Sequence, residues 1–557
     1  MVEKKAEAAD EKEEPTYVFN EEPEEITSSL DSALPAQAST VPVVKETAPV
    51  QAIARRQGFP TDEEIRAKGL IEINSQSLVL KLSHLGARIV EADLKKFRDT
   101  LGEDSKIYNL VEHTIGAPFP LGVYASGFND SWVSYQILST KNLQKEGNAY
   151  LVKDSSEDDA SIVLRGQFPD GREVSKIISL SPKGYLLDVS VVFSSVSQDP
   201  RPFELEWTNY VPEKSGSLLD PYNITGYAWY DGSSVTREAF SDFEDKKKEL
   251  GSVTWASMGG KYFTSALISP NTPTSARAIR TSDLHRIRFA SGDSINGEYK
   301  AYLGPKGYRE LEATGYGLEK NVNFGWAGFL SAPMLSLLHL FYGIFKNYGI
   351  AIVVLTILVK LALFPLTNAS FKSMKAMQTL APEVAKLKKN VKDRQKQQQE
   401  IMALYRKKGV NPLGGCLPML LQMPVFFGLY SGLIASVELR HAPFGMWIMD
   451  LSSKESLMIA GFSVPVMVIF FSLAMLAQQW LTPSNMDPAQ KKAMLVMPLV
   501  FGFIFANLPA GCVLYSLTNS LISIGQQQAL HRNWNSFKAT SLLSIVIFVA
   551  SVIFSQL

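Results

Sequence analysis

The stretch from Tyr348 to Leu366 constrains the fold more than any other, because it is nineteen residues long and carries one charge, Lys360. At about 1.5 Å of rise per residue, a helix of this length can span most of the roughly 30 Å hydrocarbon core of a bilayer. A lysine at that depth costs roughly 2.5–3.5 kcal/mol, so it usually faces a polar cavity or a partner. Lys360 is therefore a candidate intramembrane cation, and snorkelling of its stem towards the nearer interface is the alternative.

Composition divides the 557 residues into two parts. Residues 1–325 have the pattern of a water-soluble protein, and residues 326–557 have that of a membrane protein. The formal net charge is zero, so no overall field points to DNA as a partner. The two cysteines, Cys416 and Cys512, lie in apolar segments, which favours neither a disulfide framework nor a zinc site.

The first sixty residues contain no apolar run. Residues 1–30 carry ten acids against three lysines, and residues 31–60 are rich in Ala, Ser, Thr, Val and Pro. A segment of this composition cannot bury a core. We therefore expect residues 1–60 to be a disordered tether.

Between residues 61 and 325, short β-rich runs are separated by turn residues. YLLDVSVVF (185–193) is an example, because it alternates apolar with polar residues as a half-buried strand does. About a dozen such runs predict a large β-sandwich. His84, His113 and His285 are isolated in the sequence, and neither a Gly-rich phosphate loop nor a nucleophile elbow accompanies them. The region is interpreted as a binding or scaffolding domain rather than an enzyme.

The segments on either side of the first span indicate its orientation. Residues 326–347 are apolar and aromatic, which predicts a helix lying along the membrane surface. Residues 367–411 predict a helical hairpin, and between Phe371 and Gly409 they hold eleven Lys or Arg and three acids. By the positive-inside rule this hairpin is cytoplasmic, so the span 348–366 runs inwards and the β-rich region lies outside the cytoplasm. Two interpretations of the basic residues are open. They act only as a signal that fixes the orientation of the spans, or they also contact ribosomal RNA or lipid headgroups.

Residues 412–530 hold four further apolar segments that are rich in polar and helix-bending residues. Such residues need partners or water in lipid. Hydrogen bonding between helices is one interpretation, and with Lys360 a wet groove inside a small bundle is another. The four segments of residues 412–530 lie at about 412–437, 457–480, 493–509 and 511–530.

Residues 531–557 comprise a linker and an apolar run, 541–554, that predicts a sixth span.

Several motifs in the membrane half occur in one order: NPLGGCLPMLLQMPVFFGLY (411–430), SVELRHAPFGMWIMDLS (436–452) and VLYSLTNSLISIGQQQ (513–528). Together with the basic hairpin, they resemble the YidC/Oxa family of membrane protein insertases. YLGPK (302–306) and FGW (324–326) are similar to the junction in Gram-negative members. The resemblance is strong over about residues 300–532 and weaker over the β-rich region. It implies a multi-domain membrane protein, with an all-β periplasmic supersandwich followed by an α-helical transmembrane bundle of five core spans. Beyond these five core spans, the sequence predicts one extra C-terminal span.

The resemblance also implies a function and a set of sites. The chain is expected to insert and help fold nascent membrane proteins in the cell inner membrane, without enzymatic chemistry, cofactor or metal. Its expected partners are nascent membrane proteins, the ribosome, the Sec translocon and membrane lipids. A hydrophilic groove in this family carries one positive charge, and Lys360 occupies that position. The implied groove residues are Lys360, Gln422, Thr518 and Asn519; the implied hydrophobic slide is Met423, Pro424, Phe427, Phe501 and Tyr515; the implied hairpin contacts are Lys386, Lys388, Lys389, Lys392 and Arg394.

The chain departs from the family pattern at two points. The groove cation is usually arginine, whereas Lys360 is a lysine, which can lose its proton when it is buried. Family members of the Gram-negative type also carry a span ahead of the outer domain, where residues 1–60 have none. The apolar run 541–554 would cross in the same direction as that span. Two interpretations of this run remain open. Either the usual order of spans is circularly permuted in this chain, or the run is a tail anchor unrelated to the missing span.

Two other functions account for parts of the sequence. An ion-coupled transporter or channel could use Lys360, although the sequence shows neither an inverted repeat nor paired intramembrane carboxylates. A membrane-anchored protein that binds or processes sugars would work through the β-rich region. Loss of most of that region would abolish such an activity but leave an insertase working.

Overall fold

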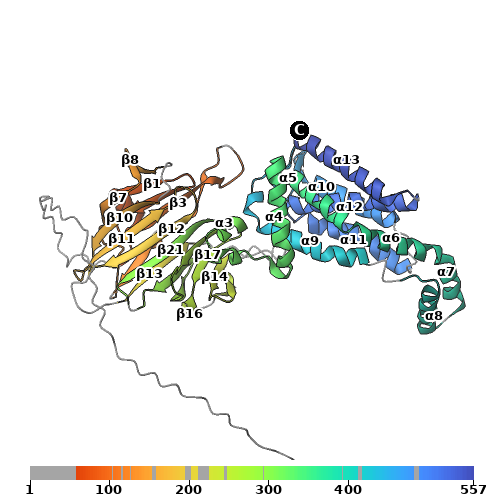
Figure 1. Cartoon of the computed structure of the whole chain (residues 1–557), viewed down its shortest axis with the longest axis horizontal. Coiled ribbons are helices and arrows are strands. Elements are labelled where there is room, and N and C mark those ends of the chain that lie inside the picture. The colour runs from red at the N-terminus through yellow and green to blue at the C-terminus, as the bar shows by residue number, and fades with distance from the viewer. Residues whose placement is uncertain are drawn as a thin grey trace, which may run out of the picture. The chain divides into compact units, whose positions relative to one another are not determined.

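The computed structural model describes residues 58–556 apart from 103, 114–116, 126, 154–158, 195–201, 211–224, 244–246, 293, 392, 412–416, 482–487 and 533. Nearly all of the predicted tether, residues 1–57, lies outside the described residues. The described chain forms a β-rich domain followed by a helical region (Figure 1). This order confirms the division that composition predicts.

The first sheet of the β-rich domain has six strands. Its neighbouring strands are antiparallel, except that β1 and β9 run parallel. In spatial order the strands are β4 (Ile107–Asn109), β3 (Ile89–Arg98), β2 (Leu78–Ser83), β1 (Leu70–Asn74), β9 (Ala149–Val152) and β8 (Leu143–Glu146).

Two larger antiparallel sheets complete the domain. The nine-stranded sheet runs β15 (Val235–Ala239), β14 (Gly226–Tyr230), β17 (Trp255–Gly259), β18 (Phe263–Ile268), β21 (Asn296–Pro305), β12 (Leu186–Phe193), β11 (Glu173–Leu180), β10 (Ala160–Gln167), β7 (Gln136–Lys141). The six-stranded sheet runs β16 (Lys247–Val253), β19 (Thr274–Thr281), β20 (Leu284–Ala290), β13 (Phe203–Tyr210), β5 (Gly122–Ala125), β6 (Phe128–Asn129). The short helices around the sheets are α2 (Asp62–Ala67), α3 (Tyr308–Glu312), η1 (Phe240–Asp242) and η2 (Leu318–Asn321).

The alternating pattern of the sequence explains how these sheets bury one face. In β12, Leu187, Val189 and Val191 are buried, while the residues between them are partly exposed. Side chains on one face of a strand recur every second residue, so such a pattern places all the apolar groups on one side. All three sheets contribute to one cluster of buried hydrophobic side chains, whose largest members include Trp207 and Trp255.

A carboxylate, Asp130, is buried in this core between two cations. Asp130 is completely buried, and its Oδ1 accepts a hydrogen bond from Arg88 Nη2 at 3.0 Å. Lys176 Nζ lies 2.6 Å from Asp130 Oδ2 and donates to the carbonyl oxygens of Gly86 and Leu121, each at 2.6 Å. Buried charges are tolerated when they are paired and hydrogen-bonded in this way. The cluster has the character of a structural element of the core.

His285 is a buried base in β20. Its ring stacks on Phe240 with 3.6 Å between ring centroids, and Nδ1 shares a 3.0 Å hydrogen bond with the Tyr227 hydroxyl. Burial, reinforced by the Arg280 guanidinium, lowers the pKa of the His285 imidazole from 6.5 to about 3. His285 is therefore neutral in the folded domain, and its environment serves packing rather than catalysis.

The depressed pKa predicts how acid affects the β-rich domain. Between pH 6.5 and 3 the unfolded chain protonates His285 and the folded chain does not, so the stabilisation present above pH 6.5 is lost as the pH falls. The free energy of unfolding should drop by about 2 kcal/mol from this group between pH 7 and pH 5. Urea unfolding of the full chain in detergent at both pH values measures the drop. In His285→Gln the pH dependence should be correspondingly smaller, and equal pH dependence in both proteins would contradict the assignment.

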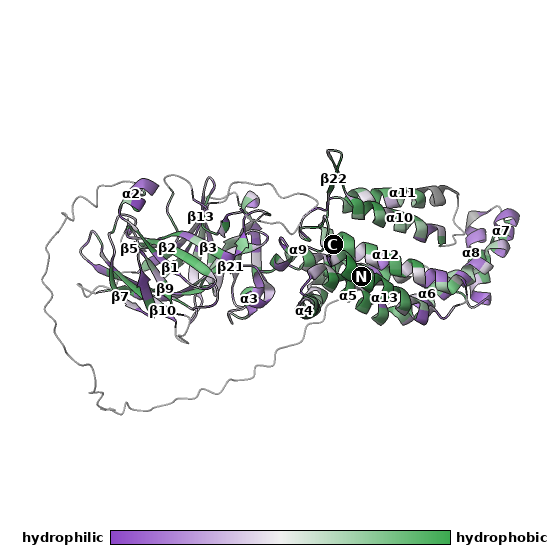
Figure 2. Ribbon diagram, turned by 90° about the horizontal axis from the view of Figure 1, so that it is seen from above, coloured by the Kyte–Doolittle hydropathy of each residue, from purple (hydrophilic) through white to green (hydrophobic). Residues whose placement is uncertain are grey.

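The helical region contains apolar helices and a polar hairpin. Hydrophobic residues dominate α5, α10 and α13, whereas hydrophilic residues dominate α7 and α8 (Figure 2). The helices are η3 (Gly325–Ala327), α4 (Gly328–Phe345), α5 (Tyr348–Ala362), α6 (Phe364–Thr379), α7 (Ala381–Asn390), α8 (Arg394–Lys407), α9 (Leu417–Ala435), η5 (Val437–Leu439), α10 (Val466–Leu481), α11 (Pro488–Phe505), α12 (Ala510–His531) and α13 (Ser536–Gln556).

Two boundaries differ from those the sequence predicts. The helix that starts at Tyr348 ends at Ala362, and α6 continues after a bend of 64°. Pro365 stands in the first turn of α6, where its missing N–H is tolerated. The segment predicted as a span from residue 457 begins instead with a hairpin of β22 (Leu457–Ile459) and β23 (Phe462–Val464). Its turn is Ala460-Gly461, both with positive φ, so α10 starts only at Val466.

Length and apolar character identify the candidate spans among the described residues. The helices Gly325–Phe345 and Ser536–Gln556 are each long and apolar enough to cross a bilayer. The bent pair α5 and α6 is a third candidate if both helices form one span. Gln422–Ala435, Val466–Leu481 and Met494–Phe505 are apolar but shorter. The count of five core spans, and an interfacial position for α4, therefore belong to the proposal below.

Candidate functional site

Lys360 lies near the C-terminal end of α5 and is only 7% exposed. Its Nζ donates a 2.7 Å hydrogen bond to Oγ of Ser523 on α12. The Ser523 hydroxyl in turn donates to the backbone oxygen of Asn519 at 2.8 Å. A cation in an apolar environment needs such groups in place of water. The contact between Lys360 and Ser523 therefore joins α5 to α12 through a polar interaction.

Further polar residues extend this site along α12 and α6. Gln526 is buried, and its Nε2 donates a 3.1 Å hydrogen bond to Oγ1 of Thr367. Asn519, Ser523 and Gln526 recur at spacings of four and three residues, so they share one face of a helix. We call Lys360, Thr367, Asn519, Ser523 and Gln526 the polar cluster.

Sequence reasoning identified only part of the polar cluster. Lys360 and Asn519 are predicted groove residues, whereas Ser523, Gln526 and Thr367 are not. The helical spacing along α12 could have identified Ser523 and Gln526. Thr367 could not be found in this way, because its place depends on the bend between α5 and α6.

Several buried polar atoms near the polar cluster have no hydrogen-bond partner within the described chain. An unpaired buried polar atom costs about 1–3 kcal/mol, so few survive in native proteins unless water or a ligand reaches them. Of the twelve such atoms among the described residues, six lie in the β-rich domain and six on α6, α12 and α13. Those on the helices are Oδ1 of Asn368 and Oγ of Ser370 on α6, Oδ1 of Asn519 and Oε1 of Gln527 on α12, and the hydroxyls of Thr540 and Ser544 on α13.

The other predicted groove residues also lie on α9 and α12. Gln422 on α9 donates a 2.5 Å hydrogen bond from Nε2 to the Tyr515 hydroxyl on α12. Tyr515 is predicted as part of the hydrophobic slide, but the structure buries it and pairs it with a groove residue. Thr518 is buried on α12 beside Asn519. Gln422 and Tyr515 therefore form a second polar contact between helices.

The remaining slide residues lie on α9 and α11. Met423 is 44% exposed, and the Phe427 ring packs against Trp326 with 5.7 Å between centroids. Pro424 stands inside α9, and Phe501 of α11 is partly buried. Between Met494 and Phe505 most side chains of α11 are apolar and exposed, as in Phe503 at 75%. An apolar surface of this kind suits lipid or an apolar peptide segment rather than water.

The basic hairpin consists of α7 and α8. Leu380, Val384 and Tyr405 form its small buried core. Lys386, Lys388 and Lys389 are carried by α7 on the outside of this core. Lys392 and the side chain of Arg394 lie outside the described residues.

Comparison with known proteins assigns the two parts of the chain. Residues 70–337 match the family description YidC periplasmic domain, and residues 340–537 match 60Kd inner membrane protein. Membrane protein insertase YidC of Syntrophus aciditrophicus is 36% identical, over 80% of this chain and 82% of its own. YidC of Oleidesulfovibrio alaskensis is 37% identical over 78% and 81%, and that of Geotalea daltonii is 32% identical over 93% and 96%. The chain belongs to the YidC/Oxa family of membrane protein insertases.

Membership in the YidC/Oxa family confirms several expectations. Members of this family are insertases rather than enzymes. The matches support an inner-membrane protein with a periplasmic domain, which is the β-rich domain described above. The comparisons favour neither a transporter nor a sugar-processing protein.

The contact between Lys360 and Ser523 can be tested through stability. Ser523→Ala removes the acceptor of the Lys360 ammonium, which should cost about 1–3 kcal/mol and lower the melting temperature. In a Lys360→Met background the same change should cost much less, because no buried cation then needs the hydroxyl. Thermal unfolding of the four proteins in detergent measures the difference. Ser551→Ala is the matched control, since that hydroxyl donates to its own helix at Phe548. Equal costs in both backgrounds would contradict the pairing.

Proposed function

We propose that this chain inserts segments of nascent membrane proteins into the inner membrane through a hydrophilic groove built around the polar cluster. The observation that carries the proposal is the buried Lys360, which is held by one hydroxyl on the neighbouring helix. The unpaired polar atoms on α6, α12 and α13 support it, because they offer hydrogen bonds to a polar chain passing between the helices. Family membership supplies the reaction class.

Lys360 is proposed to attract the polar or acidic flank of a substrate segment. A polar backbone loses its water when it moves towards the bilayer centre, and each group left unpaired costs free energy. The ammonium of Lys360 and the side chains of Asn519 and Gln526 would replace part of that water. The energetic obstacle to moving the flank would then be lower, while nothing is covalently changed.

The apolar part of the substrate is proposed to leave by the slide formed by α9 and α11. Met423 and Phe427 present apolar surface there, with Pro424 and Phe501 beside them. Partition of the apolar segment into lipid supplies the driving force. Tyr515 marks the boundary between the slide and the groove, because its ring lies in the aromatic cluster with Phe426 while its hydroxyl bonds Gln422.

The topology that follows has five core spans: α5 with α6, then α9, α10, α11 and α12. The helix α4 would lie along the outer membrane surface, and α13 would be the extra span. The basic hairpin α7–α8 would be cytoplasmic, where Lys386, Lys388 and Lys389 could contact the ribosome or lipid headgroups. The Sec translocon is a further proposed partner.

Removing the groove charge tests this proposal. Lys360→Ala should slow insertion of a substrate with an acidic translocated tail roughly tenfold, which corresponds to losing about 1.4 kcal/mol of charge interaction. A substrate with an uncharged tail should be affected much less. Lys360→Arg should retain most of the activity, because it keeps the charge. Insertion into proteoliposomes, followed by protease protection of the tail, measures all of these rates.

Lys396→Ala is the matched control, because it removes one exposed lysine from the hairpin α8. All variants are compared at equal amounts of folded, membrane-embedded protein. Normal insertion of the acidic substrate by Lys360→Ala would contradict the proposed role of the charge. A similar loss in Lys396→Ala would assign the effect to general electrostatics instead.

A further inference from the structure

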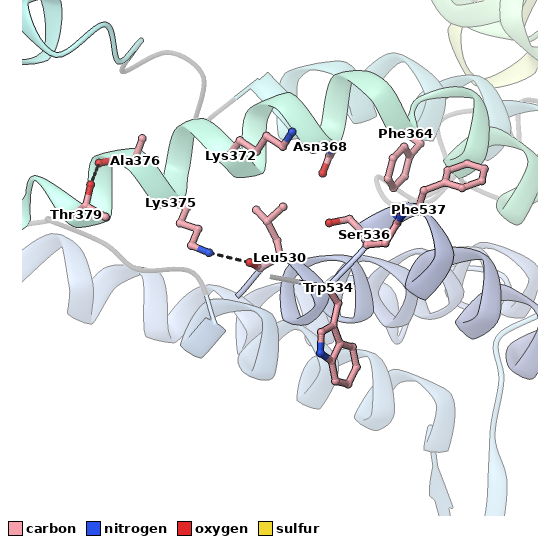
Figure 3. A pocket seen from close by; sticks show the side chains of 11 residues that line it. Phe364, Asn368, Lys372, Lys375, Ala376, Thr379, Leu530, Trp534, Ser536 and Phe537 are labelled. Carbon is pink, nitrogen blue, oxygen red and sulfur yellow. Dashed lines mark hydrogen bonds between the residues drawn. The ribbon is translucent and has the colours of Figure 1, made fainter. Parts of the chain in front are cut away.

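A cavity of about 670 Å³ lies beside α6, and Asn368 lines it, but none of the five polar-cluster residues does. Figure 3 shows α6 along one side of it, with Leu530 at the end of α12 and Trp534 and Phe537 on the other side. The segment that closes the cavity therefore joins α12 to α13. Without α13 and the linker before it, the cavity would be an open flank of α6.

The lining of this cavity is basic. Lys372 and Lys375 of α6 both line it, and the lining includes no acidic side chain. Lys375 Nζ donates a 2.9 Å hydrogen bond to the backbone oxygen of Leu530, which holds its ammonium at the cavity wall. Lys372 is exposed. Two lysines without a carboxylate among the lining residues favour an anionic occupant.

Aromatic residues also line the cavity, although the Trp534 ring is directed away from α6 (Figure 3). Phe364 of α6 meets Phe537 of α13 edge to face, with 5.3 Å between ring centroids. Trp534 and Phe537 are 59% and 54% exposed, and the Arg532 guanidinium lies 5.2 Å from the Trp534 ring centre. Exposed aromatic side chains beside basic groups are typical of the boundary between lipid and water.

The position of the cavity along α13 agrees with that boundary. The cavity is lined by Ser536 and Phe537, the first residues of a helix that is long and apolar enough to span a bilayer. In the next turns of α13, Leu542, Ile545 and Val546 are all exposed and apolar. If α13 crosses the bilayer, its first turn and the two lysines stand at the height of lipid headgroups.

We infer that the cavity between α6 and the α12–α13 linker binds the phosphate headgroup of an anionic phospholipid. The lysines would hold the phosphate, the rings of Phe364 and Phe537 would hold the glycerol region, and the acyl chains would extend along the exposed face of α13. This inference goes beyond the insertase function, since it concerns how α13 is held against α6. A lipid is favoured over an acidic peptide because Leu530 and Phe537 line the side opposite the lysines, and Phe537 stands at the start of a helix long and apolar enough to span a membrane.

Native mass spectrometry of the full chain with equal amounts of phosphatidylglycerol and phosphatidylcholine tests the inference. The wild-type chain should retain one phosphatidylglycerol in preference to phosphatidylcholine. K372Q/K375Q should weaken that binding by about 30-fold, as expected for two lysines near a lipid phosphate. The matched control is K396Q/K407Q, which removes the same charge from α8 and should keep the preference.

A second measurement locates the lipid within the chain. Phosphatidylglycerol with brominated acyl chains should quench Trp534 fluorescence, isolated as the difference between the wild type and Trp534→Phe. It should quench more than brominated phosphatidylcholine does. This comparison uses the folded wild-type chain and stands even if K372Q/K375Q fails to fold.

Four outcomes would overturn the lipid assignment. The first is an equal loss of phosphatidylglycerol in K396Q/K407Q, and the second is equal quenching of Trp534 by both lipids. The third is displacement of the lipid by millimolar inorganic phosphate, which would indicate a site for free phosphate. The fourth is displacement by a hexaglutamate peptide, which would indicate a site for acidic polypeptide.

Discussion

The hydrogen bond from Lys360 on α5 to Ser523 on α12 is the constraint on which the membrane half depends. A lysine among apolar helices is tolerated only where the protein supplies polar groups in place of water. That requirement fixes which face of α12 turns towards α5, and Asn519 and Gln526 follow on the same face. The bend after Ala362 then brings Thr367 of α6 within reach of Gln526. One charge thereby aligns three helices around a polar interior.

The two buried lysines of this chain show how different surroundings suit different roles. Lys176 in the β-rich domain has a carboxylate and two carbonyl oxygens as partners, and its neighbour Arg88 shares the same Asp130. In this set the two cations share one buried carboxylate, and the Lys176 ammonium has three oxygen partners. Within the described chain, Lys360 on α5 donates one hydrogen bond, to the Ser523 hydroxyl, and the neighbouring helices α6, α12 and α13 carry unpaired polar atoms. An arrangement of this kind is poised to accept a substrate's polar groups, whereas the Asp130 cluster is suited to stability.

The sequence was sufficient to predict the division into a β-rich and a helical part, because both rest on hydrophobic patterning. It also singled out Lys360, since a lone charge in a long apolar stretch carries a known cost. Ser523 was not predicted, because a serine in a membrane helix usually bonds its own backbone and only the neighbouring lysine distinguishes this one. The β22–β23 hairpin was missed because its apolar strands continue directly into α10, so that composition alone cannot separate them. The unexposed position of Tyr515 depends on packing between α9 and α12, which no local pattern encodes.

The central claim is that polar and apolar parts of one substrate take separate places in this bundle. Photo-crosslinking from residue 519 and from residue 427 to a stalled nascent membrane protein tests it most directly. The account predicts that residue 519 captures the polar flank, that residue 427 captures the apolar segment, and that both contacts shift along the substrate as it lengthens. Crosslinks from both positions to the same part of the substrate at every length, or from neither position in a folded, membrane-embedded chain, would contradict it.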